Sequence, residues 1–282
     1  MRGNRIWGKK PEEDLLMDEK PLIMEQRGKV ALLTMNRPTV LNALNDGLRE
    51  SIISACGELR NDDSVWAVVL TGAGRGFSSG ADVSSPRPED VLEESRQERI
   101  NVYGWVGRLS TAIYRTLDKP MIAAVNGVAA GAGMSTALAC DIRVGTPNSR
   151  FKVVFLERSL CTDTGMSFFL PRIVGYSRAC DLIFTSRFVE AEEAHRIGLL
   201  DRLVPADRLI DESVALANEI ASLPPVAMQV TRRLLQLSME SYFEQQLRNE
   251  SYGLIMARRA PHDMQEQRDS FREKRPPKFT GQ

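Results

Sequence analysis

Short apolar runs that each stop at glycine or proline alternate with amphipathic stretches over the larger part of this chain. Three such runs are Val30 to Pro38, Val65 to Leu70 and Met121 to Val125. Runs this short, bounded by turn-forming residues, predict buried strands. Between them, residues 44–59 and 98–117 carry apolar residues at spacings of three and four, which predicts an apolar helix face in each. This alternation of strands and helices predicts an α/β fold.

The patterning divides the chain into three parts. Residues 1–20 are polar and lack sustained periodicity, so we expect a polar N-terminal arm. Residues 21–209 hold the alternating strands and helices of a core. In residues 210–282 the strand signal disappears, and we expect a helical C-terminal region. Its predicted helices span residues 211–223, 225–239 and 241–257.

Composition excludes several classes of protein. Lys+Arg 37 balances Asp+Glu 37 among 282 residues, so no basic excess favours nucleic acid or a membrane surface as a partner. The hydrophobic content of 43% is ordinary for a globular protein. With 2 histidines and 4 widely separated cysteines, we expect no metal site. Because no apolar leader or membrane-length apolar run is visible, we expect a cytoplasmic protein with reduced cysteines.

A glycine-rich segment, TGAGRGFSSG, spans residues 71–80. Its glycine spacing does not match a dinucleotide-binding fingerprint, and no Lys-Ser/Thr pair follows to complete a phosphate-binding loop. Residues 76–80 do match the GxSxG pattern of a hydrolase nucleophile elbow. An elbow requires its serine on a sharp turn directly after a strand. A glycine-rich stretch instead separates this serine from the predicted strand, which disfavours a serine hydrolase.

A second segment of small residues, residues 126–141, follows a predicted strand and leads into an alanine-rich stretch. The first N–H groups of a helix have no partner within it, so the helix start can bind an anion or a partly negative oxygen. Tight packing of the helix against a strand would explain the small residues equally well.

Asp163 has unusually apolar neighbours in the sequence. They are Leu160, Met166, Phe168 and Phe169. A carboxylate desolvated by such neighbours has a raised pKa, which suits a general base that works near neutral pH. The alternative is that Asp163 caps a helix that begins near Thr164, and on sequence alone a cap is the commoner role for aspartate at a helix start.

Taken together, these segments resemble the crotonase superfamily, the enoyl-CoA hydratase/isomerase family, from about residue 21 to residue 281. The resemblance rests on seven ordered motifs: NRPTVLNALN, VVLTGAGRGFSSGAD, KPMIAAVNGVAAGAG, ALACDIR, LPRIVG, AEEAHRIGLLDRLVP and FREKRPPKFTG. It implies a spiral of strand–strand–helix turns with a C-terminal helical region that forms homotrimers, often paired into hexamers. It also implies an acyl-CoA substrate, in which coenzyme A is part of the substrate, and no separate cofactor.

At matching positions, the resemblance places the backbone N–H groups of Ala81 and Ala132 in an oxyanion hole for the acyl-CoA thioester. Ala132 stands where glycine is usual, but alanine keeps the N–H. Two such donors stabilise the enolate that forms when the α-carbon loses a proton. The resemblance also implies a set of substrate-binding residues: Asn42 and Ala43 along the CoA adenine, Lys274 near the CoA phosphates, and Ser79, Asp82 and Phe155.

Two departures from the family pattern indicate the subclass. Hydratases of this family use two glutamates, and the matching positions here hold Ser135 and Phe155. Asp163 matches the single acidic residue of enoyl-CoA isomerases and of the ring-epoxide isomerase of phenylacetyl-CoA breakdown. One carboxylate suffices to move a proton from one carbon to another. We therefore expect an enoyl-CoA isomerase with Asp163 as its base.

Other functions stay open at this point. The position of Asp163 also matches the aspartate nucleophile of chlorobenzoyl-CoA dehalogenases, but the tryptophan and histidine of those enzymes are not found at matching positions. Glu157 could turn inward through a shift in register and serve a hydratase, although a solvated surface glutamate is more usual. A hydrolase or carbon–carbon lyase of a cyclic acyl-CoA, and a non-catalytic acyl-CoA-binding homologue, are further alternatives. We expect His195 to be structural.

Overall fold

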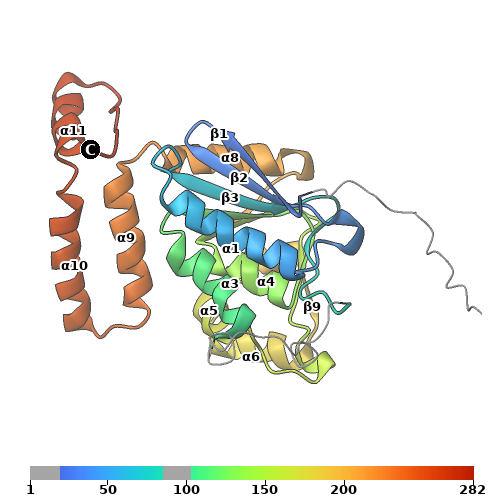
Figure 1. Ribbon diagram of the computed structural model, residues 1–282. Coiled ribbons are helices and arrows are strands. Elements are labelled where there is room, and N and C mark those ends of the chain that lie inside the picture. Colours follow the sequence, from blue (N-terminus) through green and yellow to red (C-terminus); the bar gives the residue numbers. More distant parts are fainter. Residues whose placement is uncertain (1–19, 85–102) are drawn as a thin grey trace, which may run out of the picture.

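The computed structural model describes residues 20–84 and 103–282 (Figure 1). The predicted N-terminal arm falls almost wholly outside the described residues, as does the first part of the helix expected over residues 98–117. The rest of that stretch forms helix α3, Gly104–Thr111, which continues into a π-helical turn at Ala112–Thr116.

Two β-sheets form the body of the molecule. The larger sheet has the order β1-β2-β3-β5-β7-β10, and its strand pairs are parallel except for the β1–β2 hairpin. Its strands are β1 (Leu22–Arg27), β2 (Val30–Met35), β3 (Ala67–Gly72), β5 (Met121–Val125), β7 (Ile142–Gly145) and β10 (Arg202–Leu203). The smaller sheet, β4-β6-β8-β9, consists of β4 (Gly76–Ser78), β6 (Val128–Ala130), β8 (Arg150–Lys152) and the antiparallel edge strand β9 (Phe188–Glu190).

Helices cover both faces of the larger sheet. Apolar side chains of α1, α3 and α4 share one buried cluster with alternate residues of the strands, and side chains of α8 share a second cluster with the other residues. Figure 1 shows α1 and α8 on opposite sides of this sheet. The remaining helices of the body follow the strands of the smaller sheet. The helices are α1 (Asp46–Arg60), α4 (Ala132–Ala139), α5 (Met166–Val174), α6 (Tyr176–Thr185), α7 (Ala191–Arg196) and α8 (Leu209–Ile220), with short 3-10 turns at Pro38–Val40, Leu156–Arg158 and Ala206–Arg208.

The chain order strand–strand–helix recurs among the described elements: β3, β4 and α3, then β5, β6 and α4, then β7, β8 and α5. Each repeat adds one strand to each sheet. The turn between the two strands of a repeat is tight: a Cβ on Gly127 would lie 2.1 Å from the backbone oxygen of Arg75. Glycine is needed there because any side chain would collide with backbone. The expected α/β spiral of strand–strand–helix turns is thus confirmed.

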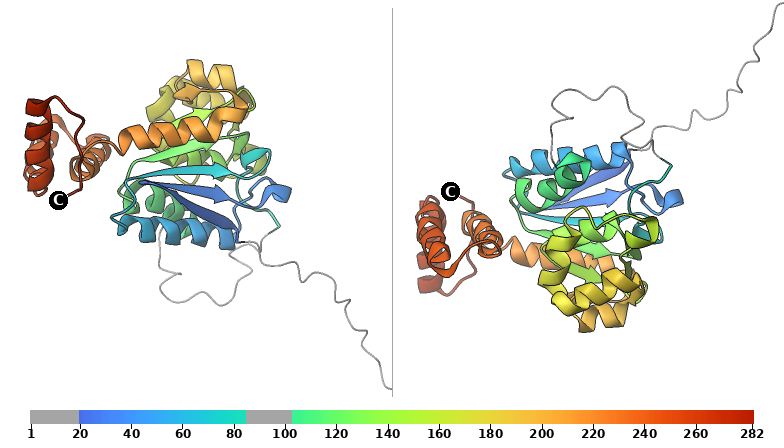
Figure 2. Two further views of the ribbon diagram at one scale, coloured as in Figure 1. Left: turned by 90° about the horizontal axis from the view of Figure 1, so that it is seen from above. Right: turned by 90° about the horizontal axis from the view of Figure 1, so that it is seen from below.

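The C-terminal arm, residues 225–273, stands apart from the body in two directions of view (Figures 1 and 2). It consists of α9 (Pro225–Ser238), α10 (Phe243–Ala257) and α11 (Pro261–Glu273). Arg232 fastens α9 to the body, because its guanidinium lies 2.8 Å from the Asp141 carboxylate and also donates to the carbonyls of Ile113 and Tyr114. The helical C-terminal region is therefore confirmed, with α11 as a helix that the sequence pattern did not predict.

Candidate active site

The loops that follow β4 and β6 meet at one edge of the smaller sheet. A Cβ on Gly80 would lie 2.8 Å from Ala130 O and 3.5 Å from Ala132 N, and a Cβ on Gly133 would lie 2.4 Å from Ser78 O. Both glycines therefore permit a backbone approach that side chains would prevent. This contact brings Ala81, the residue after Gly80, close to Ala132 at the start of α4.

The backbone N–H groups of Ala81 and Ala132 are available to a ligand. Ala81 forms a parallel bridge with Leu44 in which Leu44 N donates to Gly80 O and Asp82 N donates to Leu44 O, so the bridge does not use the N–H of Ala81. Ala132 is the first residue of α4, where N–H groups lack partners within the helix and the helix dipole is positive. Within residues 20–84 and 103–282, neither N–H donates to a protein acceptor. The two groups can therefore serve as the predicted oxyanion hole.

The loop that carries Ala81 is held by an ion pair between Arg37 and Asp82. Their closest atoms are 2.8 Å apart, and Arg37 also donates to the carbonyl of Ala43. Hydrogen bonds from Ser84, followed by the one from Arg37, hold the pKa of the Asp82 carboxyl below its usual value. The predicted site residue Asp82 thus positions Ala81 through its side chain. Arg37 was not predicted, although its place in the NRP motif was a signal.

Asn42 and Ser79 connect the loop after β2 to the turn before β4 and to the loop after β4. The side chain of Asn42 is fully buried, donates to the carbonyls of Ala73 and Gly76, and accepts from the N–H of Arg37. The N–H of Ser79 donates to Leu41 O at 2.9 Å. Asn42 therefore shapes the loop with its amide group, and the contacts of Asn42, Ala43 and Ser79 with a substrate stay predictions.

Asp163 lies beside helix α4. The hydroxyl of Ser135, one turn after Ala132 on this helix, donates to the backbone carbonyl of Asp163 at 3.3 Å. Burial raises the pKa of the Asp163 carboxyl, and a hydrogen bond of 2.7 Å from the Thr164 hydroxyl opposes the rise. The backbone of Asp163 thus lies beside the first turn of α4, which begins with Ala132, and the role of its carboxylate next to a thioester stays a prediction.

The alternative role of Asp163 as a helix cap is wrong. Helix α5 begins at Met166 and is preceded by Gly165 in the left-handed conformation, without a side-chain cap bond. The N–H of Met166 donates to the backbone carbonyl of Asp163 rather than to its carboxylate. The Asp163 side chain is therefore not used to start the helix.

The positions of the two hydratase glutamates hold buried residues without a carboxylate. Ser135 is fully buried in α4, and Phe155 is buried in the apolar cluster that also contains Ala132. The nearby Glu157 is exposed, and its carboxylate lies 2.8 Å from the Lys152 ammonium. That hydrogen bond lowers the pKa of Glu157. The hypothesis that Glu157 turns inward is therefore wrong in this structure.

Lys274 does not reach the site within one chain. It ends α11 in the C-terminal arm, which Figure 1 shows apart from α4. Beyond it, Phe279 belongs to the buried apolar cluster that contains Val30 and Trp66, at the amino ends of β2 and β3. Its predicted contact with the CoA phosphates would need an assembly of chains. His195 lies on α7, and its Nδ1 is 3.2 Å from the carbonyl oxygen of Leu200, to which an Nδ1–H group can donate.

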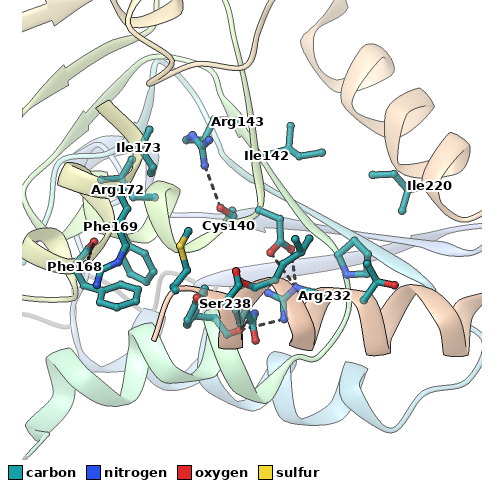
Figure 3. Close-up of a pocket in the computed structure, with 18 of the residues that line it drawn as sticks. Cys140, Ile142, Arg143, Phe168, Phe169, Arg172, Ile173, Ile220, Arg232 and Ser238 are labelled. Atoms are coloured by element: carbon teal, nitrogen blue, oxygen red, sulfur yellow. Dashed lines mark hydrogen bonds and ion pairs between the residues drawn. The ribbon is translucent and has the colours of Figure 1, made fainter. Parts of the chain in front are cut away.

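A cavity of about 600 Å³ lies between α9 and the body, near the carboxyl end of α4 (Figure 3). Its walls are mostly apolar and include Phe168 and Phe169 of α5, with Arg143 and Arg232 at its polar side. Neither of the two oxyanion donors lines this cavity, so it is distinct from the site around Ala132.

Among the described residues, no group of His, Cys, Asp and Glu is arranged to hold a metal ion, and no helix is long and apolar enough to cross a membrane.

Comparison with known proteins agrees with this geometry. The model of the family described as enoyl-CoA hydratase/isomerase matches residues 25–282. The chain belongs to the enoyl-CoA hydratase/isomerase family. The short-chain-enoyl-CoA hydratase of Clostridium acetobutylicum is 36% identical over 236 residues, which are 83% of this chain and 88% of that protein.

Solved structures of this family superpose well on the chain. A putative enoyl-CoA hydratase from Streptomyces coelicolor has a TM-score of 0.85 at 32% identity, over 98% of this chain and 100% of that one. A monofunctional enoyl-CoA isomerase from M. smegmatis has a TM-score of 0.69 at 34% identity, over 81% and 98%. Relatives described as hydratases and as an isomerase thus share this fold, and the crotonase superfamily is confirmed.

Proposed function

We propose that this member of the enoyl-CoA hydratase/isomerase family shifts the double bond of an enoyl-CoA, with Asp163 as its proton carrier. The observation that carries the proposal is Asp163, whose backbone carbonyl accepts a hydrogen bond from Ser135 of α4 and whose carboxyl has a pKa raised by burial. It stands in a site where Ser135 and Phe155 fill the positions of the two hydratase glutamates. Among the residues that the structure describes, such a site supplies one proton carrier and no second carboxylate to activate water.

The proposed reaction uses groups of this chain alone. The N–H groups of Ala81 and Ala132 donate to the thioester oxygen, and Asp163 removes a proton from C2 of a 3-enoyl-CoA. The C–H electron pair forms an enolate conjugated with the existing double bond, and its charge is stabilised at the oxygen. The Asp163 carboxylic acid then returns the proton at C4, which leaves a 2-enoyl-CoA. No metal or redox cofactor takes part in this scheme.

Hydration is the second candidate, because several relatives are described as enoyl-CoA hydratases. Addition of water needs a group that activates the water and a group that protonates the α-carbon. Glu157 is the nearest other carboxylate in the sequence, but its exposed position and its pairing with Lys152 hold it away from that role. The site residues therefore favour isomerisation.

Exchange of single carboxylates tests the proposal. We expect Asp163→Asn to keep acyl-CoA affinity and to lose about 10²–10⁴ in turnover of a 3-enoyl-CoA, the usual effect of losing a general base. The matched variant Glu157→Gln should keep wild-type turnover, because that carboxylate is paired at the surface. Unchanged turnover in Asp163→Asn, or loss only in Glu157→Gln, would reject Asp163 as the base.

We also propose that the chain forms a homotrimer or a hexamer through its C-terminal arm. Helices α9 and α10 and the turn between them expose many large apolar side chains: Leu235, Met239, Tyr242, Phe243, Leu247, Tyr252, Leu254, Ile255 and Met256. An apolar surface of this kind is typical of a protein interface. Light scattering should give a mass three or six times that of one chain, and a monomeric mass would contradict the proposal.

A further inference from the structure

The loop that carries Asp163 has an unusual backbone conformation. Thr164 has a φ of 51° and Gly165 a φ of 81°, so two successive residues lie in the left-handed region. A β-branched residue such as threonine rarely adopts this conformation, which persists only where surrounding groups enforce it. The side chain of Thr164 is buried. Groups outside the loop must therefore hold it in place.

Two serines from two different helices supply this restraint. The hydroxyl of Ser110, on α3, donates to the carbonyl of Thr164 at 2.7 Å, and the hydroxyl of Ser135, on α4, donates to the carbonyl of Asp163 at 3.3 Å. Ser110 Oγ also lies 3.2 Å from Val106 O, the usual acceptor within its own helix. The shorter bond is the one to the loop, so the hydroxyl is directed toward Thr164.

The backbone position of Asp163 matters because an aspartate side chain is short. With one methylene between Cα and the carboxyl group, the carboxylate moves with its own backbone far more directly than that of a glutamate would. Ser135 also lies on the helix that begins with Ala132. Its bond to Asp163 therefore joins the base to the same rigid element as one oxyanion donor.

We propose that Ser110 and Ser135 are positioning residues that fix the distance of the Asp163 carboxylate from the oxyanion hole. This inference rests on the proposed function of Asp163 as the base. It gives Ser135, at the position of a hydratase glutamate, a function of its own. Displacement of a reacting group by about 1 Å can cost about 10²-fold in rate, so loosening the loop should lower turnover without weakening substrate binding.

The test measures kcat and KM for a six-carbon 3-enoyl-CoA. It also measures, by mass spectrometry, the rate at which the α-proton of this substrate exchanges with D2O. We expect Ser110→Ala and Ser135→Ala each to lower kcat by about tenfold, and the double variant by up to about 10²-fold. KM should stay within about twofold, because both hydroxyls donate to backbone carbonyls of the loop and the inference gives them no direct role in substrate binding. The same serine changes in Asp163→Asn should have no further effect on exchange, because the residue on which they act is already lost.

A matched pair at Ser110 separates the hydroxyl from packing. Ser110→Thr keeps the hydroxyl, whereas Ser110→Val introduces a side chain with nearly the same shape as threonine but without a hydroxyl. We expect Ser110→Thr to retain kcat and Ser110→Val to lose it, at equal melting temperatures. Ser110 is only half-buried, so this pair is informative even where a change at the fully buried Ser135 prevents folding.

Two results would overturn the inference. One is an unchanged kcat in the serine variants. The other is a serine change that slows α-proton exchange as much in Asp163→Asn as it does in the wild-type protein. Full turnover in Asp163→Asn alone would instead reject the proposed function. The two failures are therefore distinguishable in one set of proteins.

Discussion

The two sides of the proposed active site are built by different means. The oxyanion side consists of backbone N–H groups, fixed where glycines let the loops after β4 and β6 approach each other. The base side consists of one side chain, Asp163, on a loop held by hydroxyl groups from two helices. A backbone donor tolerates a change of side chain, as alanine at position 132 illustrates, whereas the base side depends on which residues are present. Under the proposed function, the oxyanion side determines which class of substrate is activated, and the base side determines the reaction.

Of the three further changes that follow, removal of one backbone donor should have the largest effect. Proline is accepted at the first residue of a helix but has no N–H, so Ala132→Pro removes the donor while α4 can still begin there. We expect a loss of about 10²–10³ in kcat. The control Ala132→Gly keeps the N–H and should retain activity. Steady-state kinetics with a 3-enoyl-CoA measure both, and equal activity in Ala132→Pro would show that this N–H is not an oxyanion donor.

Loosening the loop that carries the other donor should have a smaller effect. Arg37→Met keeps much of the side-chain length but removes the ion pair with Asp82 and the bond to Ala43. Hydrogen bonds to charged groups contribute about 1.5–3 kcal/mol, so we expect a loss of that order in the free energy of unfolding, with reduced kcat. Denaturant unfolding and kinetics check this prediction. A variant that loses neither would show that the loop is held without Arg37.

The smallest expected effect is a shift in the pH dependence of kcat/KM, which tests whether Asp163 is the base. Burial raises the pKa of the Asp163 carboxyl, and the hydrogen bond from the Thr164 hydroxyl opposes part of this rise. Thr164→Val keeps the β-branched shape and removes the hydrogen bond, so the pKa should rise further. Because the base must be ionised, the acid limb of kcat/KM should move to higher pH. Thr164→Ser keeps the hydroxyl and should keep the limb in place; a limb that stays still or moves to lower pH in Thr164→Val would contradict the assignment.

Much of the fold follows from local patterns in the sequence. The strand Met121–Val125 has the predicted bounds, and the helix predicted over residues 44–59 begins two residues later because Asn45 caps it by accepting from Leu48 N. Helix α11 was missed because the buried residues that face its neighbours include the polar Asp263 and Ser270. An apolar periodicity cannot reveal such a face.

The candidate site was predictable where it depends on short motifs and not where it depends on distant contacts. The glycine-rich motifs predicted the loops of Ala81 and Ala132. The contact of Ser110 with Thr164 joins residues 54 positions apart, and no local pattern reports it. The left-handed conformation of Thr164 likewise has no signal in a β-branched residue. It moves the helix start to Met166 and leaves the Asp163 carboxylate free of a capping role.

The most direct measurement is mass spectrometry of the purified protein incubated with a six-carbon 3-enoyl-CoA in D2O. Our account predicts that the double bond migrates to give a 2-enoyl-CoA that has not gained the mass of a water molecule, because one carboxylate moves the proton between carbons. Deuterium enters the product to the extent that the Asp163 carboxyl proton exchanges with D2O before it reaches C4. Gain of water would contradict it and indicate a hydratase. A substrate returned without deuterium and with its double bond in place would also contradict the central claim that Asp163 and the two backbone donors form an enolate.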